Sequence, residues 1–204
     1  MIKEAADLLF HPRIFFRQKN QESPGLLVPA VIVGIGGVVT YLSPLLVVAV
    51  TRGGDISKFH VEASATLFFL LLPFALWLIS AGALFVVGRL LSGTGSFPVT
   101  LQNCGYGYLP QTLLSSLVFI NGVTLPWIAG MQPSIVLKVV AVILGFGLIL
   151  GVIWSGALWT VAMETTHGLP RFRAMAGPAI IVLFSLLPLI LIILTEGAAR
   201  VPLP

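Results

Sequence analysis

The sequence predicts an all-α fold, a polytopic membrane bundle of five transmembrane helices preceded by an interfacial amphipathic segment. The chain of 204 residues is 57% hydrophobic and only 9% charged, whereas a soluble domain carries about 25% charged residues. So few charges cannot cover a water-facing surface of this size. The apolar residues also gather in five long runs, which lack the alternation of apolar and polar residues that is typical of barrel strands.

Residues 1–25 form the predicted amphipathic segment. Apolar residues recur at helical spacing within residues 2–9, and Pro12 suits the first turn of a second short helix. This second helix carries Phe15 and Phe16 beside basic residues. Apolar rings flanked by bases are typical of a helix that lies in the headgroup layer.

Residues 26–204 form the predicted membrane domain. A helix needs about 20 apolar residues to cross the hydrocarbon core, and it must satisfy its own backbone because lipid offers no hydrogen-bond partners. The third run is the weakest of the five because it contains Gln111 and Asn121. The predicted spans are residues 26–50, 63–91, 106–128, 137–163 and 176–194.

The basic residues predict the orientation, since cytoplasmic loops carry an excess of Lys and Arg. A cytoplasmic N-terminus places seven of them inside and four outside. The inner set is Lys3, Arg13, Arg17, Lys19, Arg89, Arg171 and Arg173, and the outer set is Arg52, Lys58, Lys138 and Arg200. We therefore expect a multi-pass protein of the cell membrane with its C-terminus outside. The net charge of +4 is too small and too scattered to indicate nucleic acid.

The end of the fourth run carries the first candidate site. Glu164 and His167 are three residues apart and share a helix face. Such a pair can ligate a metal when other helices supply carboxylates, but few acidic residues fall on this side. The alternative is structural, with His167 and Gly168 ending the helix and Glu164 paired with Arg171 or Arg89. We expect no metal and no cofactor, and we keep Glu164, His167 and Arg171 as candidates for binding a partner or ligand.

The second candidate site precedes the third span. Residues 93–96 form a flexible turn in this interpretation, and Ser96 is placed to cap a short helix. Tyr106, Tyr108 and Pro110 follow, either as an interfacial belt and helix entry or as contacts for a partner or ligand.

Small residues mark possible sites of helix packing. Gly147 and Gly151 are one turn apart in the fourth run, and glycines at this spacing allow helices to approach closely. The sequence leaves open whether they pack within the bundle or between protomers of a homo-oligomer. The single cysteine, Cys104, excludes an intramolecular disulfide and a cysteine-based zinc site.

Three segments in order carry a family resemblance. They are Leu-Phe-His-Pro-Arg-Ile-Phe-Phe at 9–16, Gly-Thr-Gly-Ser-Phe at 93–97 followed by Tyr-Gly-Tyr-Leu-Pro at 106–110, and Glu-Thr-Thr-His-Gly-Leu-Pro-Arg-Phe-Arg-Ala at 164–174. Together they resemble the Yip family of membrane proteins (Ypt/Rab-interacting proteins), in particular its short archaeal and bacterial members. The resemblance implies five spans and a cytoplasmic N-terminus. Eukaryotic relatives are associated with Rab-type GTPases, vesicle traffic and membrane shaping.

We expect a non-enzymatic membrane scaffold or adaptor that organises proteins or lipids. Partners would meet its cytoplasmic face, around Phe15, Phe16, Tyr106, Tyr108, Glu164, His167 and Arg171. The alternative is a channel or transporter for a small solute, motivated by the polar residues of the third run, Gln111, Ser115, Ser116 and Asn121. A third hypothesis, an intramembrane enzyme, requires Glu164 and His167 to act together.

Overall fold

The computed structural model describes residues 2–51, 63–128 and 135–199, and each regular element in these ranges is a helix, which confirms the all-α prediction. Two short helices come first, α1 (Ile2–Phe10) and α2 (Pro12–Lys19). The long helices are α3 (Leu27–Thr51), α4 (Ala63–Leu90), α6 (Leu109–Ile128), α7 (Ile135–His167) and α9 (Ala176–Ala199). Two connecting helices are α5 (Phe97–Gly107) and the single turn α8 (Arg171–Ala174).

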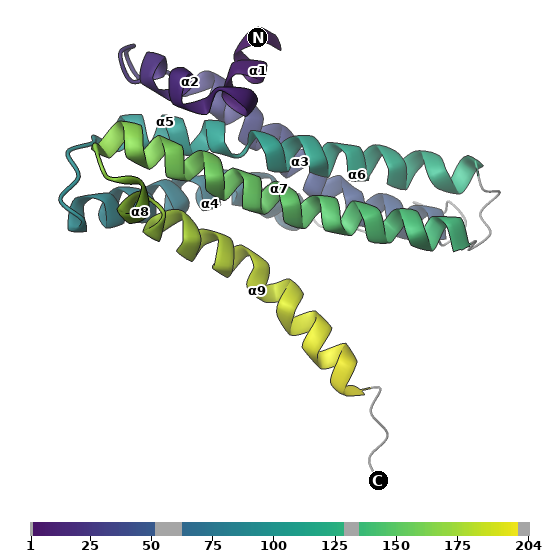
Figure 1. The fold of residues 1–204 in the computed structure, drawn as a ribbon. Helices are drawn as coiled ribbons and strands as arrows, with labels where there is room; N and C mark the ends of the chain where they lie inside the picture. The colour runs from purple at the N-terminus through teal and green to yellow at the C-terminus, as the bar shows by residue number, and fades with distance from the viewer. Residues whose placement is uncertain (1, 52–62, 129–134, 200–204) are drawn as a thin grey trace.

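Four of the long helices form the body of the molecule. Helix α3 packs against α4 and α6, and α7 packs against α6, so that the four run side by side (Figure 1). Helix α9 contacts α7 and α4 and then leaves the bundle at an angle (Figure 1). At the opposite side α1 and α2 lie across one end. This end, made of residues 2–25, 91–108 and 164–175, is called the polar end below.

The five long helices lie where five spans were predicted, with three differences of more than two residues in their bounds, one of which is that the fifth helix continues to Ala199. The third begins at Leu109, because α5 ends just before it, and the fourth continues to His167. By length and composition, Leu67–Leu90 and Val142–His167 can cross a membrane, and Leu27–Ser43 is a shorter apolar helix. That all five cross stays a prediction.

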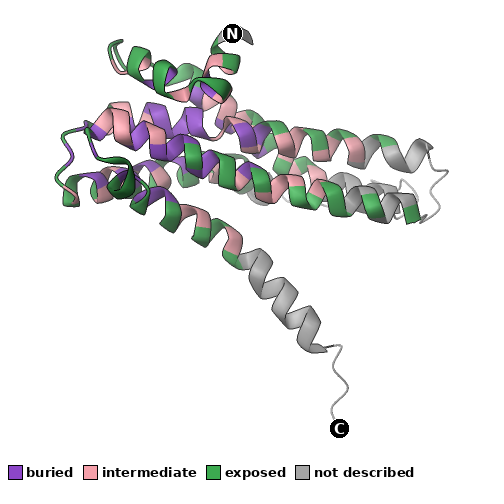
Figure 2. Ribbon diagram, in the orientation of Figure 1, coloured by how far each residue is buried: buried purple, intermediate pink, exposed green. Residues whose placement is uncertain are grey.

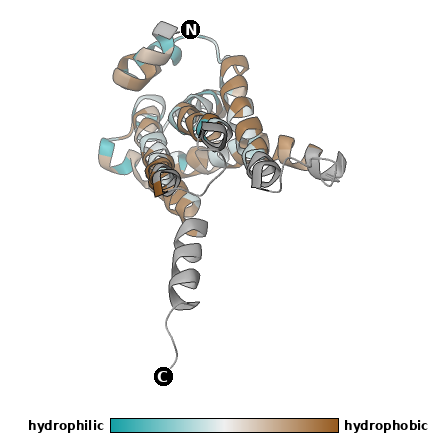
Figure 3. Cartoon of the chain, turned by 90° about the vertical axis from the view of Figure 1, so that its right-hand side faces the viewer, coloured by the Kyte–Doolittle hydropathy of each residue, from teal (hydrophilic) through white to brown (hydrophobic). Residues whose placement is uncertain are grey.

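The surface of the long helices is apolar. Phe146, Leu150 and Phe184 are 64%, 61% and 77% exposed, and hydrophobic colouring follows the described parts of the long helices in Figure 3. An apolar surface of this extent is unfavourable in water and is the ordinary surface of a helix in lipid.

The predicted cytoplasmic segments come together at the polar end. Residues 93–96 lie beside the end of α7, where the backbone N–H of Thr94 donates to the carbonyl of His167 at 3.1 Å. Three of the basic residues predicted for the outer side, Arg52, Lys58 and Arg200, lie outside the described residues.

The buried residues gather toward the polar end (Figure 2). One core cluster includes Trp77, Leu84, Trp159 and Met163. A second joins α1 and α2 to the bundle: Leu8, Phe15 and Phe16 pack with Tyr106, Leu158 and Ala162. The amphipathic segment is therefore docked on protein through the rings that were expected to meet headgroups. Phe10 and Ile14, 70% and 57% exposed, are left facing outward.

Candidate functional site

His167 ends α7 inside a pocket formed by three glycines. The residue is 2% exposed. A Cβ atom added to Gly88, Gly93 or Gly95 would lie 2.6, 2.7 or 2.8 Å from the nearest His167 side-chain atom. These distances are well inside van der Waals contact, which is about 3.5–4.0 Å between carbon atoms. At Gly88 the histidine alone leaves no space for a side chain, whereas at Gly93 and Gly95 a backbone carbonyl oxygen 2.8 Å from the added Cβ also excludes one.

The imidazole is also held by a hydrogen bond. Thr100 Oγ1 lies 3.0 Å from His167 Nε2 and 2.9 Å from the carbonyl oxygen of Ser96. A hydroxyl has one hydrogen, and Thr100 donates it to Ser96, so His167 Nε2 must be the donor to Thr100. In this tautomer His167 Nδ1 is an acceptor, and it is buried with no hydrogen-bond partner among the described residues. His167 thus fastens the start of α5 to the end of α7.

Ser96 precedes α5 as predicted, but its side chain makes no capping hydrogen bond. The side chain of Thr100 instead reaches back to the Ser96 carbonyl.

Asn103 joins three segments of the polar end. This side chain is 1% exposed, and its amide donates to Asn20 Oδ1 at 2.7 Å and to Thr166 Oγ1 at 2.8 Å. The neighbouring Gln102 accepts a hydrogen bond from the backbone N–H of Gly25 at 2.6 Å. Helix α5 therefore anchors both the end of α7 and the chain that leaves α2.

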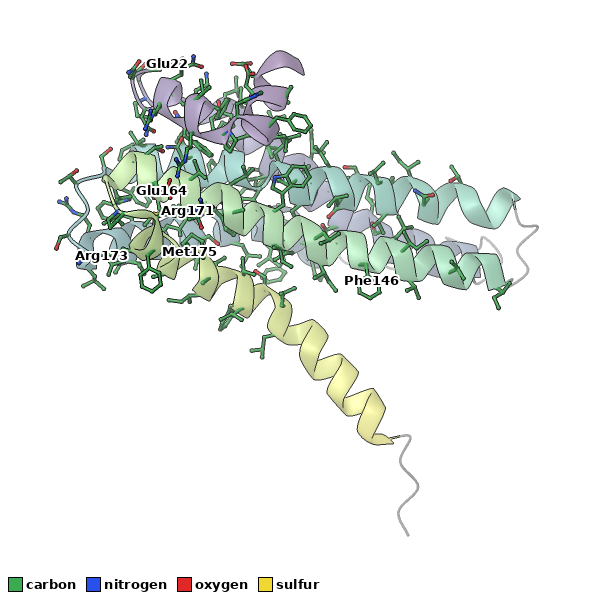
Figure 4. The ribbon with its side chains drawn as sticks, in the orientation of Figure 1. Glu22, Phe146, Glu164, Arg171, Arg173 and Met175 are labelled. Atoms are coloured by element: carbon green, nitrogen blue, oxygen red, sulfur yellow. The ribbon has the colours of Figure 1, made fainter. Side chains whose placement is uncertain are left out.

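Glu164 faces away from this interior. Its Oε2 accepts a hydrogen bond from Arg13 Nη2 at 2.9 Å, and its Oε1 lies 3.9 Å from Arg171 Nε. The carboxylate is 12% exposed, whereas the two arginine side chains are 57% and 75% exposed. Figure 4 shows Glu164 and Arg171 close together beside α7.

The predicted pairing of Glu164 is found with Arg171 and not with Arg89. Arg89 donates to the carbonyl of Gly93 at 3.3 Å and lies over the ring of Phe85, 5.8 Å from its centroid. It therefore helps to close the connection between α4 and α5.

An open hollow of about 400 Å³ lies over Glu164, between α2 and the turn from α7 to α8. We call it the arginine hollow. Its lining residues are Arg13, Arg17, Glu164, Thr165, Gly168, Leu169 and Arg171.

Glu164 and His167 have different neighbours although they are three residues apart. Glu164 contacts α2 and α8, and His167 contacts the connection between α4 and α5. Within the described residues, no three His, Cys, Asp or Glu side chains come together as a metal site would need. The geometry gives no support to an enzyme in which these two residues act together.

The remaining partner-binding candidates are mostly covered. The ring centroids of Phe15 and Tyr106 are 5.0 Å apart in an edge-to-face contact. Tyr108 meets Trp159 in the same way at 5.0 Å. The candidates that are buried are Phe15, Phe16, Tyr106, Pro110 and His167, with Tyr108 partly buried. A partner that meets this folded surface reaches Glu164 and Arg171, and direct contact with the other six stays a prediction.

The two glycines of the fourth run differ. A Cβ added to Gly151 would lie 2.9 Å from Leu114 of α6, whereas one added to Gly147 would meet nothing within 4 Å. Gly151 therefore sits at a close contact within the bundle, and Gly147 faces open space.

Sequence reasoning did not single out Arg13, Arg17 or Thr100 as site residues, and it included Asn103 only as the first residue of the segment that holds Tyr106, Tyr108 and Pro110. One signal was available for the arginines, because residues four apart share a helix face and Arg13 and Arg17 are so spaced. The partners of Thr100 and Asn103 could not be predicted, since they lie 63 to 83 residues away along the chain.

Comparison with known proteins adds one match. A family model described as the Yip1 domain matches residues 6–193, a range that includes the arginine hollow and the glycine pocket of His167. No curated protein matches the chain, and no solved structure does.

Proposed function

The chain belongs to the Yip1-domain family of membrane proteins, and from that premise we propose that it is a non-enzymatic scaffold or adaptor that organises other membrane proteins or lipids. We also propose that it resides in the cell membrane with its polar end in the cytoplasm and its C-terminus outside. The excess of basic residues at the polar end supports this orientation.

One observation carries the scaffold proposal. The inward-facing polar side chains of the polar end bind other parts of the same protein: His167 binds Thr100, and Asn103 binds Asn20 and Thr166. A catalytic site needs reactive groups that converge on space for a substrate. Here the interior groups hold segments together, and the groups left exposed form a surface.

That exposed surface combines charge with apolar side chains. Arg13 and Arg171 reach outward, and Phe172 and Met175 beside them are 88% and 49% exposed. Arginine and large apolar residues are enriched where proteins bind one another. A partner would therefore meet α2, α8 and the start of α9.

Site-specific photocrosslinking in native membranes tests the proposal. A benzoyl-phenylalanine replaces Phe172 at the polar end, and a matched variant carries it at Phe146, which is exposed on the apolar part of α7. We expect position 172 to capture one discrete protein, or a second copy of this chain, and position 146 to capture lipid. If both positions capture only lipid, the protein-scaffold proposal fails.

The channel or transporter alternative gains no support from the polar residues of α6. Ser116 Oγ donates to the carbonyl of Thr112 at 2.8 Å, and Asn121 Nδ2 donates to the carbonyl of Leu117 at 2.8 Å. These two side chains direct a donor to their own helix and not to a pore. In reconstituted liposomes we expect solute flux no faster than in empty vesicles, and a clear increase would restore this alternative.

A further inference from the structure

The arginine hollow has the composition of an anion site. Three guanidinium groups, those of Arg13, Arg17 and Arg171, surround the single carboxylate of Glu164. Each guanidinium offers five N–H donors and a carboxylate only two acceptor oxygens, so most of the donors remain available. The hollow keeps an excess of two positive charges.

Two of the three arginines are held at defined positions by Glu164. Glu164 is largely covered and accepts from Arg13 at 2.9 Å, with Arg171 at 3.9 Å on its other oxygen. Arg17 has no hydrogen bond or ion pair with the part of the chain that the structure describes. Its guanidinium is therefore free for a ligand, while Glu164 orients the other two.

Glu164 also adds a requirement of its own. Its Oε1 is buried, so the oxygen that a ligand can reach is Oε2, which accepts one hydrogen bond from Arg13 and has a second lone pair. A carboxylate oxygen accepts hydrogen bonds and repels a bare anion. The best ligand would therefore present a phosphate to the arginines and a hydroxyl donor to Glu164.

The surroundings favour a lipid as the source of this phosphate. Phe172 follows Arg171 directly and is 88% exposed, and Ile14 follows Arg13 and is 57% exposed. Apolar side chains beside basic ones are typical of the level where headgroups meet acyl chains. Arginine also matches phosphate geometry through two parallel N–H groups.

We propose that the arginine hollow binds the headgroup of an anionic glycerophospholipid that carries a hydroxyl group, with Arg13, Arg17 and Arg171 on the phosphate and Glu164 on the hydroxyl. Phosphatidylglycerol is the simplest probe with this chemistry. The inference goes beyond the proposed scaffold role, because it names a lipid ligand and the atoms that recognise it.

Thermal unfolding of the full-length protein in neutral detergent micelles tests the inference. Phosphatidylglycerol or phosphatidylcholine of the same acyl chains is added, and the preference is the ratio of their apparent binding constants. We expect the wild type to prefer phosphatidylglycerol, and Arg17→Gln or Arg171→Gln to reduce this preference about tenfold each, as the loss of one hydrogen bond between charged groups predicts.

Arg173→Gln is the matched control. It removes the same charge from an exposed position on α8 that does not line the hollow. The preference of this variant should stay within about twofold of the wild type, because salt screens an exposed charge that does not touch the ligand. If Arg173→Gln reduces the preference as much as Arg17→Gln does, the effect is one of general charge and the site is refuted.

Inorganic phosphate distinguishes the lipid from a soluble anion. We expect ~10 mM phosphate to leave the preference for phosphatidylglycerol largely intact, because the diester also offers a hydroxyl and acyl chains. If phosphate alone stabilises the wild type as strongly and abolishes the lipid preference, the hollow is a soluble-anion site and the lipid assignment is overturned. A bound lipid would also be captured at position 172, so only capture of a protein at that position bears on the scaffold proposal.

Discussion

The fit of His167 among three glycines gives a sharp test of the packing at the polar end. In Gly88→Ala the new Cβ would lie 2.6 Å from His167 Cε1 and Nδ1 and 3.0 Å from Cγ, and all three are ring atoms. Overlap of about 1 Å with a ring that neighbouring segments enclose requires a shift. Overpacking of this kind typically costs about 1–3 kcal/mol of the free energy of unfolding.

Removing the ring should remove the penalty. His167→Ala alone loses the Thr100 contact and leaves a cavity, at a cost of about 2–5 kcal/mol on the scale of large-to-small core substitutions. In the double variant the new methyl group at position 88 has space, and alanine is favoured over glycine in a helix by about 0.5–1 kcal/mol. We therefore expect Gly88→Ala to be neutral or slightly stabilising when it is made in the His167→Ala background.

The measurement is a double-mutant cycle of unfolding free energies in detergent micelles. The expected coupling is about 1–3 kcal/mol, within the range for residues in direct contact. Gly95→Ala is the control, because its Cβ would also lie 2.8 Å from the backbone carbonyl of Thr166, which His167→Ala does not remove. If Gly88→Ala costs the same with and without the ring, the account of the pocket is refuted.

Three further predictions concern the termini of helices, the pairing of α1 with α2, and the orientation. Ser92 and Gly168 both have positive φ, 68° and 66°. Ser92→Gly should therefore raise the free energy of unfolding in micelles by about 1 kcal/mol, and Gly168→Ala should lower it by a similar amount. A destabilising Ser92→Gly or a stabilising Gly168→Ala would contradict this. Lys19 Nζ lies 3.4 Å from Glu4 Oε1 and lowers the pKa of the Glu4 carboxyl. The stability that this ion pair contributes is therefore fully present above the ordinary pKa of 4.5 and is lost as the pH falls through the lowered pKa. The protection factors of the α1 amides, which compare their exchange with intrinsic exchange at the same pH, should fall over that acidic window in the wild type, and Glu4→Gln should lack this step. Thr94→Cys should react with an impermeant maleimide only when the cytoplasmic side is accessible, and labelling from outside intact cells would reverse the proposed orientation.

The sequence predicted the long helices well because length and apolarity alone determine them. A run of about 20 apolar residues in lipid has few alternatives to a helix, and the bounds of α3 and α4 differ from the predicted spans by no more than one residue. The break at Tyr108 was not predicted, since Tyr106–Pro110 reads as one continuous entry into a span. In the structure this break turns the chain from α5, which is packed among other helices, into α6.

The site was less predictable because its contacts join distant parts of the chain. Gly93 and Gly95 were interpreted as a flexible turn, but the space beside them is occupied by His167, more than 70 residues later. A single sequence does not distinguish a glycine that is needed because another side chain packs against it from a glycine that makes a turn flexible. Arg13 and Glu164 are 151 residues apart, so only the docking of α2 on α7 brings them together.

The docking of α2 on the bundle allows a test of whether the lipid is recognised by a formed site or only attracted by net positive charge. Phe16 is fully buried in the contact of α2 with the bundle, and truncation of a buried Phe costs about 3–5 kcal/mol. Phe16→Ala should therefore release α2 and carry Arg13 and Arg17 away from Arg171, while every arginine remains in the chain. If the hollow recognises a headgroup by geometry, this variant loses the preference for phosphatidylglycerol although its net charge is unchanged. Gln18→Ala, at an exposed position of the same helix that does not line the hollow, should retain the preference, and amide exchange in α2 reports the release. A released α2 with an unchanged lipid preference would show that charge alone accounts for the binding.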